Sequence, residues 1–137
     1  MILLQIISPE DKKRLVYEAL QAQKMAYAPY SGFKVGAALL FENGEIVRGC
    51  NVENSSFGAT ICAERNAMTT AIALGLQKPL AAAIVGIEGK ICAPCGSCRQ
   101  VLAEFNEEME IILQDGSTLL EIKLSELLPM HFSLSKV

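Results

Sequence analysis

The sequence predicts an α/β fold, a three-layer α/β/α sandwich with a mixed central sheet of about five strands. Apolar residues recur at helical spacing in some segments and form short continuous runs in others, which are the signatures of amphipathic helices and buried strands. The two kinds of segment alternate, and strands joined through helices pack as a sheet between helical layers. With 137 residues, of which 51% are hydrophobic and 20% charged, the chain suits one folded unit, so we expect a single domain over residues 1–137.

The first helix is expected to begin after Ser8, whose hydroxyl suits an N-cap. Pro9 fits the first helical position, and two acidic residues follow in the first turn, where the helix dipole favours negative charge. Pro29 ends this helix by about residue 28, because the residue before a proline avoids helical geometry.

The remaining elements are bounded by turn and cap signals. Asn43-Gly44 predicts a hairpin turn between two strands, Gly75 stops a helix rich in Ala and Met, and Asp115-Gly116 ends the last assigned strand. A short continuous apolar run suits a central strand that is buried on both faces. We expect strands at residues 33–41, 46–52, 80–87 and 110–114, and helices at residues 62–74, 94–105 and 125–128. Four strands of the sheet are thereby assigned.

The charge and the cysteine content exclude several classes of protein. A net charge of −3 speaks against tight binding to a nucleic-acid backbone, which calls for a basic face. The apolar start is too short for a signal peptide, and no apolar run approaches the roughly 20 residues needed to span a membrane. Five cysteines cannot all pair, and clustered thiols favour metal binding in a reducing compartment. We therefore expect a cytoplasmic protein.

Three cysteines and one glutamate carry the expected chemistry. Cys62, Cys95 and Cys98 supply three thiolates for one zinc ion. Three protein ligands leave the fourth tetrahedral position open for water, whereas a structural zinc is closed by four. Glu64 adds a carboxylate beside the metal that need not be a ligand. We expect Glu64 to take a proton from the zinc-bound water and deliver it to the substrate.

The charge of such a site has to be offset. Three thiolates on Zn²⁺ carry a net charge of −1, which would hold up the pKa of the bound water. Cys62 and Cys95 stand at expected helix starts, so two helix dipoles can point at the metal. Arg65 lies three residues after Cys62 and can donate to a thiolate from the same helix face. We expect Arg65 to tune the site through that contact.

Five stretches together resemble one known family, although a CxxC pair alone would be weak evidence. The stretches are residues 28–31 (APYS), 33–39 (FKVGAAL), 49–54 (GCNVEN), 62–65 (CAER) and 94–102 (PCGSCRQVL). In combination they are specific. The chain resembles the small, homotetrameric class of the cytidine deaminases, from about residue 27 to about residue 129.

The resemblance implies an enzyme that hydrolytically deaminates cytidine and 2′-deoxycytidine and releases ammonia, as a step of pyrimidine salvage. It implies one Zn²⁺ per chain, with zinc-bound hydroxide attacking C4 while Glu64 shuttles protons. It also implies a homotetramer with its sites at subunit interfaces. The expected partner is a small-molecule nucleoside, with neither nucleic acid nor a membrane as a partner.

Five residues correspond to the substrate contacts of the family. The resemblance implies that Phe33 packs on the pyrimidine ring and that the backbone at Ala63 contacts the base. It also implies that Asn51 and Glu53 hold a ribose hydroxyl, and these side chains do supply the donor and the acceptor that a hydroxyl needs. Relatives place an aromatic residue over the site of a neighbouring subunit, and Phe132 is the candidate here, although the spacing of the tail departs from the usual pattern.

Some residues keep a second interpretation. A structural zinc would need Cys50 or Cys92 as a fourth ligand, but both are expected to be small buried hydrophobes. His131 is the only histidine, and we expect it to be exposed in the tail.

Two other functions also stay open. The same zinc chemistry would suit a deaminase of nucleic acid or of another cytosine nucleoside. From a different class, the dithiol at positions 95 and 98 suits a redox protein, because a CxxC pair at a helix start is also the thioredoxin-like arrangement. That function would leave Cys62 and Glu64 without a role.

Overall fold

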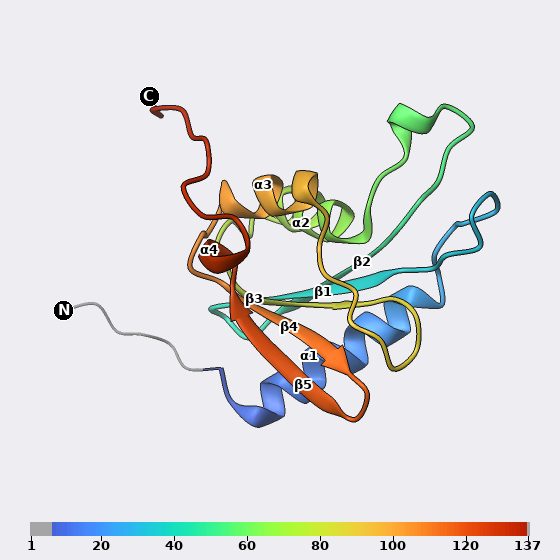
Figure 1. Cartoon of the computed structure of the whole chain (residues 1–137). Helices are drawn as coiled ribbons and strands as arrows, with labels where there is room; N and C mark the ends of the chain where they lie inside the picture. Colours follow the sequence, from blue (N-terminus) through green and yellow to red (C-terminus); the bar gives the residue numbers. More distant parts are fainter. Residues whose placement is uncertain (1–6, 137) are drawn as a thin grey trace.

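Five strands form one mixed sheet in the order β2-β1-β3-β4-β5 (Figure 1). This computed structural model describes residues 7–136. The strands are β1 (Gly36–Phe41), β2 (Ile46–Cys50), β3 (Pro79–Val85), β4 (Glu110–Asp115) and β5 (Thr118–Lys123). Only β3 and β4 run parallel, while β1 pairs antiparallel with β2 and β3, and β4 pairs antiparallel with β5.

The helices cover both faces of this sheet. The helices are α1 (Pro9–Gln23), α2 (Ala63–Ala73), α3 (Gly96–Ala103), α4 (Leu124–Leu127) and the short 3₁₀ helix η1 (Phe57–Ala59). Helix α1 packs on β1, β2 and β3, α2 packs on β1 and β2, and α3 contacts α2 and α4. Figure 1 shows α1 on one side of the sheet and α2 and α3 on the other. The predicted three-layer α/β/α sandwich on a mixed sheet is therefore confirmed.

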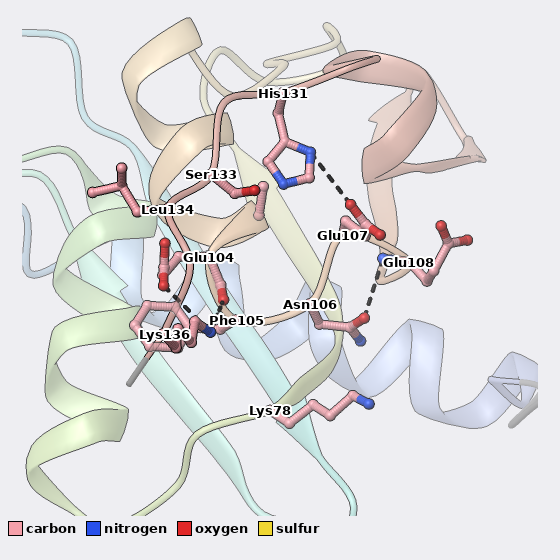
Figure 2. Close-up of a pocket in the computed structure, with 11 residues that line it drawn as sticks. Lys78, Glu104, Phe105, Asn106, Glu107, Glu108, His131, Ser133, Leu134 and Lys136 are labelled. Carbon is pink, nitrogen blue, oxygen red and sulfur yellow. Dashed lines mark hydrogen bonds and ion pairs between the residues drawn. The ribbon is translucent and has the colours of Figure 1, made fainter.

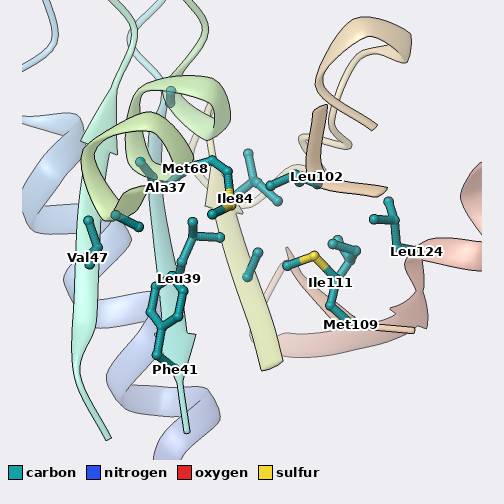
Figure 3. Close-up of a cluster of buried hydrophobic side chains, with 14 of the residues drawn as sticks. Ala37, Leu39, Phe41, Val47, Met68, Ile84, Leu102, Met109, Ile111 and Leu124 are labelled. Carbon is teal, nitrogen blue, oxygen red and sulfur yellow. The ribbon is translucent and has the colours of Figure 1, made fainter. Parts of the chain in front are cut away.

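Two hydrophobic clusters fill the spaces between the layers. Leu15 and Ala19 of α1 belong to the cluster on one face. Leu39, Met68 and Leu102, from β1, α2 and α3, belong to the cluster on the other face (Figure 3). All five side chains are fully buried, and each buried Leu or Met stabilises the fold by about 1.5–3 kcal/mol. This packing holds α2 and α3 against the same face of the sheet.

The fifth strand lies where the sequence had suggested no element. Strand β5 pairs with β4 from Glu110↔Lys123 to Asp115↔Thr118, so Asp115-Gly116 is a hairpin turn and not only a strand end. Gly116 has φ +62°, a value that favours glycine. The side chains of β5 are half-buried or exposed, because an edge strand is covered incompletely. Its apolar pattern is correspondingly weak.

Two predicted strands are shorter than expected because the backbone at one end of each finds partners outside the β1–β2 ladder. Strand β1 begins at Gly36 and not at residue 33, since the Asn51 side chain binds the backbone of Phe33 and Val35. Strand β2 ends at Cys50, and the chain beyond it forms single bridges through Val52. The helix expected from residue 94 begins at Gly96.

No helix between residues 7 and 136 combines the length and the apolar character that a membrane crossing requires.

Candidate metal centre and adjoining pocket

Three thiols converge at one point between α2 and α3. The sulfur atoms of Cys62, Cys95 and Cys98 all lie within 4.8 Å of one another. The Cys62 and Cys95 sulfurs are 4.0 Å apart, and the Cys95 and Cys98 sulfurs are 3.3 Å apart. Tetrahedral zinc with Zn–S bonds of about 2.3 Å requires sulfurs about 3.8 Å apart. The observed spacing therefore fits a zinc ion with three thiolate ligands and one further position.

The helix starts explain why the thiols meet. Cys62 is the N-cap of α2 and Cys95 is the N-cap of α3, and both have extended backbone angles. An extended N-cap directs its side chain past the helix end, so both thiols lie beyond the first turns. Cys98 is buried within the first turn of α3. The positive ends of two helix dipoles thus face the three sulfurs.

The environment shifts the pKa values of the thiols in different directions. Burial raises the pKa of Cys98 well above its ordinary value, and the Glu64 carboxylate and the other two thiols add to this effect. Burial acts on Cys95 as well, but the backbone N–H and thiol of Cys98 and the Cys62 thiol outweigh it and lower the pKa of Cys95. Cysteine ligates metals as the thiolate. A divalent cation among the three sulfurs would favour that form.

Glu64 is the carboxyl closest in sequence to this cluster, and it lies in the first turn of α2. The Glu64 residue is only 4% exposed. Burial raises the pKa of this carboxyl, while its own backbone N–H, the Cys98 thiol and the Arg65 charge act in the opposite direction. A buried carboxyl with a raised pKa beside the Cys98 thiol is a candidate for general acid–base chemistry.

The Arg65 side chain bridges the metal cluster and the loop before α2. Its Nη2 lies 3.9 Å from the Cys62 sulfur and donates to the Thr60 carbonyl at 3.2 Å. The hydrogen bond to Cys62 raises the pKa of the guanidinium, so the group is cationic. Within residues 7–136, the buried Nε of Arg65 has no hydrogen-bond partner. Arg65 therefore places a positive charge, with donor capacity left over, beside the Cys62 sulfur.

Asn51 occupies the space between the end of β2 and the segment that carries Phe33. The Asn51 Nδ2 donates to the Phe33 carbonyl at 2.8 Å, and its Oδ1 accepts from the Val35 N–H at 2.8 Å. The Asn51 residue is 8% exposed, whereas Phe33 is 41% exposed. A primary amide has a second N–H and a second lone pair. Asn51 can therefore hold the backbone of this segment and still contact a ligand.

The Glu53 carboxylate, which the family resemblance implies holds a ribose hydroxyl, also orders a loop of the protein. Its Oε1 accepts from the N–H groups of Tyr30 and Ser31 at 3.0 and 3.1 Å, and its Oε2 accepts from the Ser31 hydroxyl. These bonds, led by those from Ser31, lower the pKa of Glu53. A carboxylate offers about four lone-pair sites, so one remains. The Glu53 residue is half-buried.

A cavity of about 440 Å³ opens beside this carboxylate. It is lined by residues of the loops that follow α1 and β2, namely Tyr30, Ser31, Glu53, Asn54, Ser55, Phe57 and Thr60.

Ala63 directly follows the cluster residue Cys62, and Gly86 lies beside Phe33 and Cys92. Ala63 is fully buried, and as the first helical residue its N–H has no partner within the helix. Gly86 follows β3, and a Cβ placed there would lie 2.8 Å from the Cys92 sulfur and 3.1 Å from Phe33 Cζ. The Phe33 ring and Cys92 therefore flank Gly86.

Cys50 and Cys92 lie outside the metal cluster. Among residues 7–136, that cluster comprises Cys62, Cys95 and Cys98 only. Both other thiols are half-buried, and burial is the largest cause that raises the pKa of each. The geometry of these residues therefore provides three cysteine ligands and not the four of a structural zinc site.

The C-terminal tail runs along α3 and away from the cluster. The Gln100 Nε2 donates to the Phe132 carbonyl at 2.9 Å, and the Phe132 residue is 69% exposed. A cavity of about 600 Å³ lies between the tail and the segment after α3, and Figure 2 shows the His131 ring directed toward Glu107 there. The His131 Nδ1 is 3.3 Å from a Glu107 carboxylate oxygen, and the imidazole is only 16% exposed. The expectation of an exposed His131 was wrong, because this contact draws the ring inward.

Three residues that bear on the pocket had no role in the sequence analysis. Tyr30 and Ser31 supply the donors that hold Glu53. Gln23, the last residue of α1, donates to the carbonyls of Lys34 and Gly86. Nothing in the spacing of a single glutamine in an amphipathic helix signals contacts with two distant backbone segments.

The matched family model extends over most of the chain. A model described as the cytidine and deoxycytidylate deaminase zinc-binding region matches residues 9–113. That range contains the three clustered thiols and Glu64. The predicted zinc requirement is confirmed by this match together with the three-cysteine cluster.

Curated proteins with similar sequences carry a consistent description. The chain is 44% identical to a cytidine deaminase of Halalkalibacterium halodurans over 125 residues, which covers 90% of this chain and 95% of the relative. It is 45% identical to a cytidine deaminase of Sporosarcina psychrophila over 126 residues, with coverage of 90% and 92%.

Solved structures agree with these sequences. A cytidine deaminase from Burkholderia pseudomallei superposes with a TM-score of 0.83 at 42% identity and covers 88% of this chain and 98% of its own. A cytidine deaminase from Mycobacterium tuberculosis superposes with a TM-score of 0.81 at 43% identity, with coverage of 90% and 98%. The similarity therefore spans nearly the full length of each relative.

Proposed function

Because this chain belongs to the cytidine and deoxycytidylate deaminase family, we propose that it hydrolyses cytidine and 2′-deoxycytidine to uridine and 2′-deoxyuridine. The observation that carries the proposal is the convergence of Cys62, Cys95 and Cys98, with the buried Glu64 in the same helix turn as the first of these ligands. A CxxC redox protein would require neither Cys62 nor Glu64.

Cys62, Cys95 and Cys98 would hold one zinc ion, which would supply a water molecule of lowered pKa. Glu64 takes a proton from the attacking water and delivers it to the ring nitrogen of the base. It then takes the remaining proton from the new hydroxyl on C4 and passes it to the amino group, and the C4–N bond breaks so that ammonia departs while the oxygen stays on C4 as a carbonyl. One shuttling carboxylate of this kind accounts for a factor of about 10²–10⁴ in rate.

The nucleoside would lie between the metal cluster and the cavity beside Glu53. Phe33 packs on the pyrimidine ring, and the N–H of Ala63 contacts the base. Asn51 donates to a ribose hydroxyl and Glu53 accepts from it, each with the hydrogen-bonding capacity that the backbone contacts leave over. The charge of Glu53 would repel a phosphate at that position, which favours a free nucleoside over nucleic acid.

The proposal also includes the domain organisation, the assembly and the location of the protein. Residues 1–137 constitute a single deaminase domain, supported by one continuous sheet in the described residues. Four copies assemble, and the exposed Phe132 reaches the site of a neighbouring subunit. The protein works in the cytoplasm, where thiols stay reduced.

The deciding experiment measures zinc content and turnover on one purified sample. We expect one zinc per chain, loss of cytidine absorbance, and one ammonia released per cytidine. Zinc without cytidine turnover would point to another cytosine nucleoside or to nucleic acid. A reduced, zinc-supplied sample with neither zinc nor turnover would favour the dithiol redox protein.

A further inference from the structure

We propose that Gln23 is a positioning residue for the nucleoside pocket, because its side-chain amide ties the segment carrying Phe33 to the end of β3. The inference rests on the proposed function, since it takes Phe33 as the residue that packs on the base.

The Gln23 amide bridges two backbone segments that are distant in sequence. Its Nε2 donates to the Lys34 carbonyl at 3.0 Å and to the Gly86 carbonyl at 2.5 Å. A primary amide nitrogen has two N–H groups, so both bonds form at once. Lys34 directly follows Phe33, and Gly86 directly follows β3. One side chain therefore links these two segments just beyond the last β1–β3 pair, Gly36↔Val85.

The Phe33 ring lies against one of the two linked segments. A Cβ built on Gly86 would come 3.1 Å from Phe33 Cζ and 2.8 Å from the Cys92 sulfur. Gly86 thus presents bare backbone to the edge of the ring, and the ring has little room to move toward β3. If the tie between Lys34 and Gly86 were released, the ring could shift with its segment.

The segment needs such ties because it lies just outside the strand ladder. Strand β1 begins only at Gly36. Successive carbonyls in an extended chain point to opposite sides. The Asn51 amide takes the Phe33 carbonyl from the side of β2, and the Gln23 amide takes the Lys34 carbonyl from the side of α1. Two amides from different elements hold the segment from both sides.

A glycine brings Gln23 within reach. A Cβ at Gly36 would lie 2.0 Å from the Ala19 carbonyl oxygen and 2.6 Å from the Gln23 nitrogen. The last turns of α1 therefore rest directly on the start of β1. The Gln23 side chain can then extend past this contact to both carbonyls.

The test compares three substitutions of Gln23 in the zinc-loaded enzyme. Gln23→Met removes both donors at similar length, and we expect KM for cytidine to rise about tenfold with kcat changed less than about twofold, the signature of lost ground-state positioning. Gln23→Glu sets a carboxylate against two carbonyl oxygens and should raise KM further. Gln23→Arg restores N–H donors and should return KM to within about threefold of wild type.

Gln21→Met is the matched control, because Gln21 lies on the same helix and, within residues 7–136, its side chain forms a hydrogen bond only with Lys24. It should keep the wild-type KM. A wild-type KM in Gln23→Met would overturn the proposal. The proposal would also be overturned if Gln23→Met and Gln23→Arg changed kcat, KM and melting temperature to the same extent, because that result indicates a general structural role.

Amide hydrogen exchange separates this inference from the proposed function. In Gln23→Met without nucleoside, the Val35 N–H should exchange about tenfold faster than in wild type, since its segment is held on one side only. Unchanged exchange would overturn the tie itself. Absence of cytidine turnover in the wild-type enzyme would instead overturn the function, whatever the exchange result.

Discussion

Gly49 of β2 lies so close to Ala63, the first residue of α2, that a Cβ at Gly49 would come within 2.4 Å of the Ala63 carbonyl oxygen. The backbone nitrogen of Ala67 would be equally close, at 2.4 Å. Helix α2 begins after Cys62 and carries Glu64 in its first turn. Because Gly49 has no side chain, α2 can pack close to β2. This close packing sets the position of Cys62, a predicted metal ligand, and of Glu64, the predicted proton carrier.

Gly49→Ala should destabilise the protein and weaken zinc binding together. The added methyl forces α2 away from the sheet, and overpacking of this kind costs about 1–3 kcal/mol or more. Thermal unfolding and zinc titration would measure the two effects. Gly58→Ala is the matched control, because its Cβ would meet nothing within 4 Å. Equal behaviour of the two variants would contradict the prediction.

Glu64→Gln should keep the fold and the zinc but lose activity. Glutamine fills the same buried space but its amide cannot act as a general acid or base, so turnover should fall by a factor of about 10²–10⁴. Burial raises the pKa of the Glu64 carboxyl, so a neutral amide should not lower the melting temperature. Zinc content, melting temperature and kcat on cytidine are the measurements. Retained turnover would remove Glu64 from the mechanism.

Cys62→Ala should lose zinc, whereas Cys50→Ala should retain it. Cys62 belongs to the group of three thiols within 4.8 Å of one another, and Cys50 does not. Both changes remove one half-buried thiol, so the comparison isolates the position of the sulfur. Metal analysis after dialysis is sufficient. Full zinc retention in Cys62→Ala would mean a different ligand set.

Arg65→Ala should weaken zinc retention and lower turnover, because the guanidinium lies 3.9 Å from the Cys62 sulfur. Hydrogen bonds to charged groups contribute about 1.5–3 kcal/mol, so zinc affinity should fall by one to two orders of magnitude. Arg14→Ala controls for loss of an arginine elsewhere, since Arg14 contacts Gly44 and Asp11 at the surface. Unchanged zinc affinity and turnover in Arg65→Ala would exclude a tuning role.

The stability that Glu53 contributes should depend on pH. Hydrogen bonds from Ser31 and Tyr30 hold the pKa of the Glu53 carboxyl below its ordinary value of 4.5. A group with a lowered folded-state pKa stabilises the fold above the ordinary value, and this stabilisation is lost as pH falls through the lowered pKa. The difference in unfolding free energy between wild type and Glu53→Gln should therefore shrink below pH 4.5. Ser31→Ala should reduce that difference at neutral pH, and a difference independent of pH would contradict the assignment.

Much of the fold was predictable because its signals are local. The Ser8 cap, for example, accepts from the Asp11 N–H at 3.1 Å, and Gly75 adopts φ +87° where α2 ends. Strand β5 (Thr118–Lys123) was not predicted. It is an edge strand that is stabilised by pairing with β4, and such pairing produces only a weak pattern in the sequence of the strand itself.

The sequence by itself determined which residue types stand at the two helix starts: cysteines at positions 62 and 95, with Cys98 and Glu64 within the first turns. These are local properties of the chain. Only the tertiary structure decided that the two helix starts meet, and that Gln23 and Asn51 hold the Phe33 segment from opposite sides. Such contacts join segments up to 63 residues apart, and they form because packing on a shared sheet brings those backbone groups within hydrogen-bonding distance, where a buried polar group must find a partner.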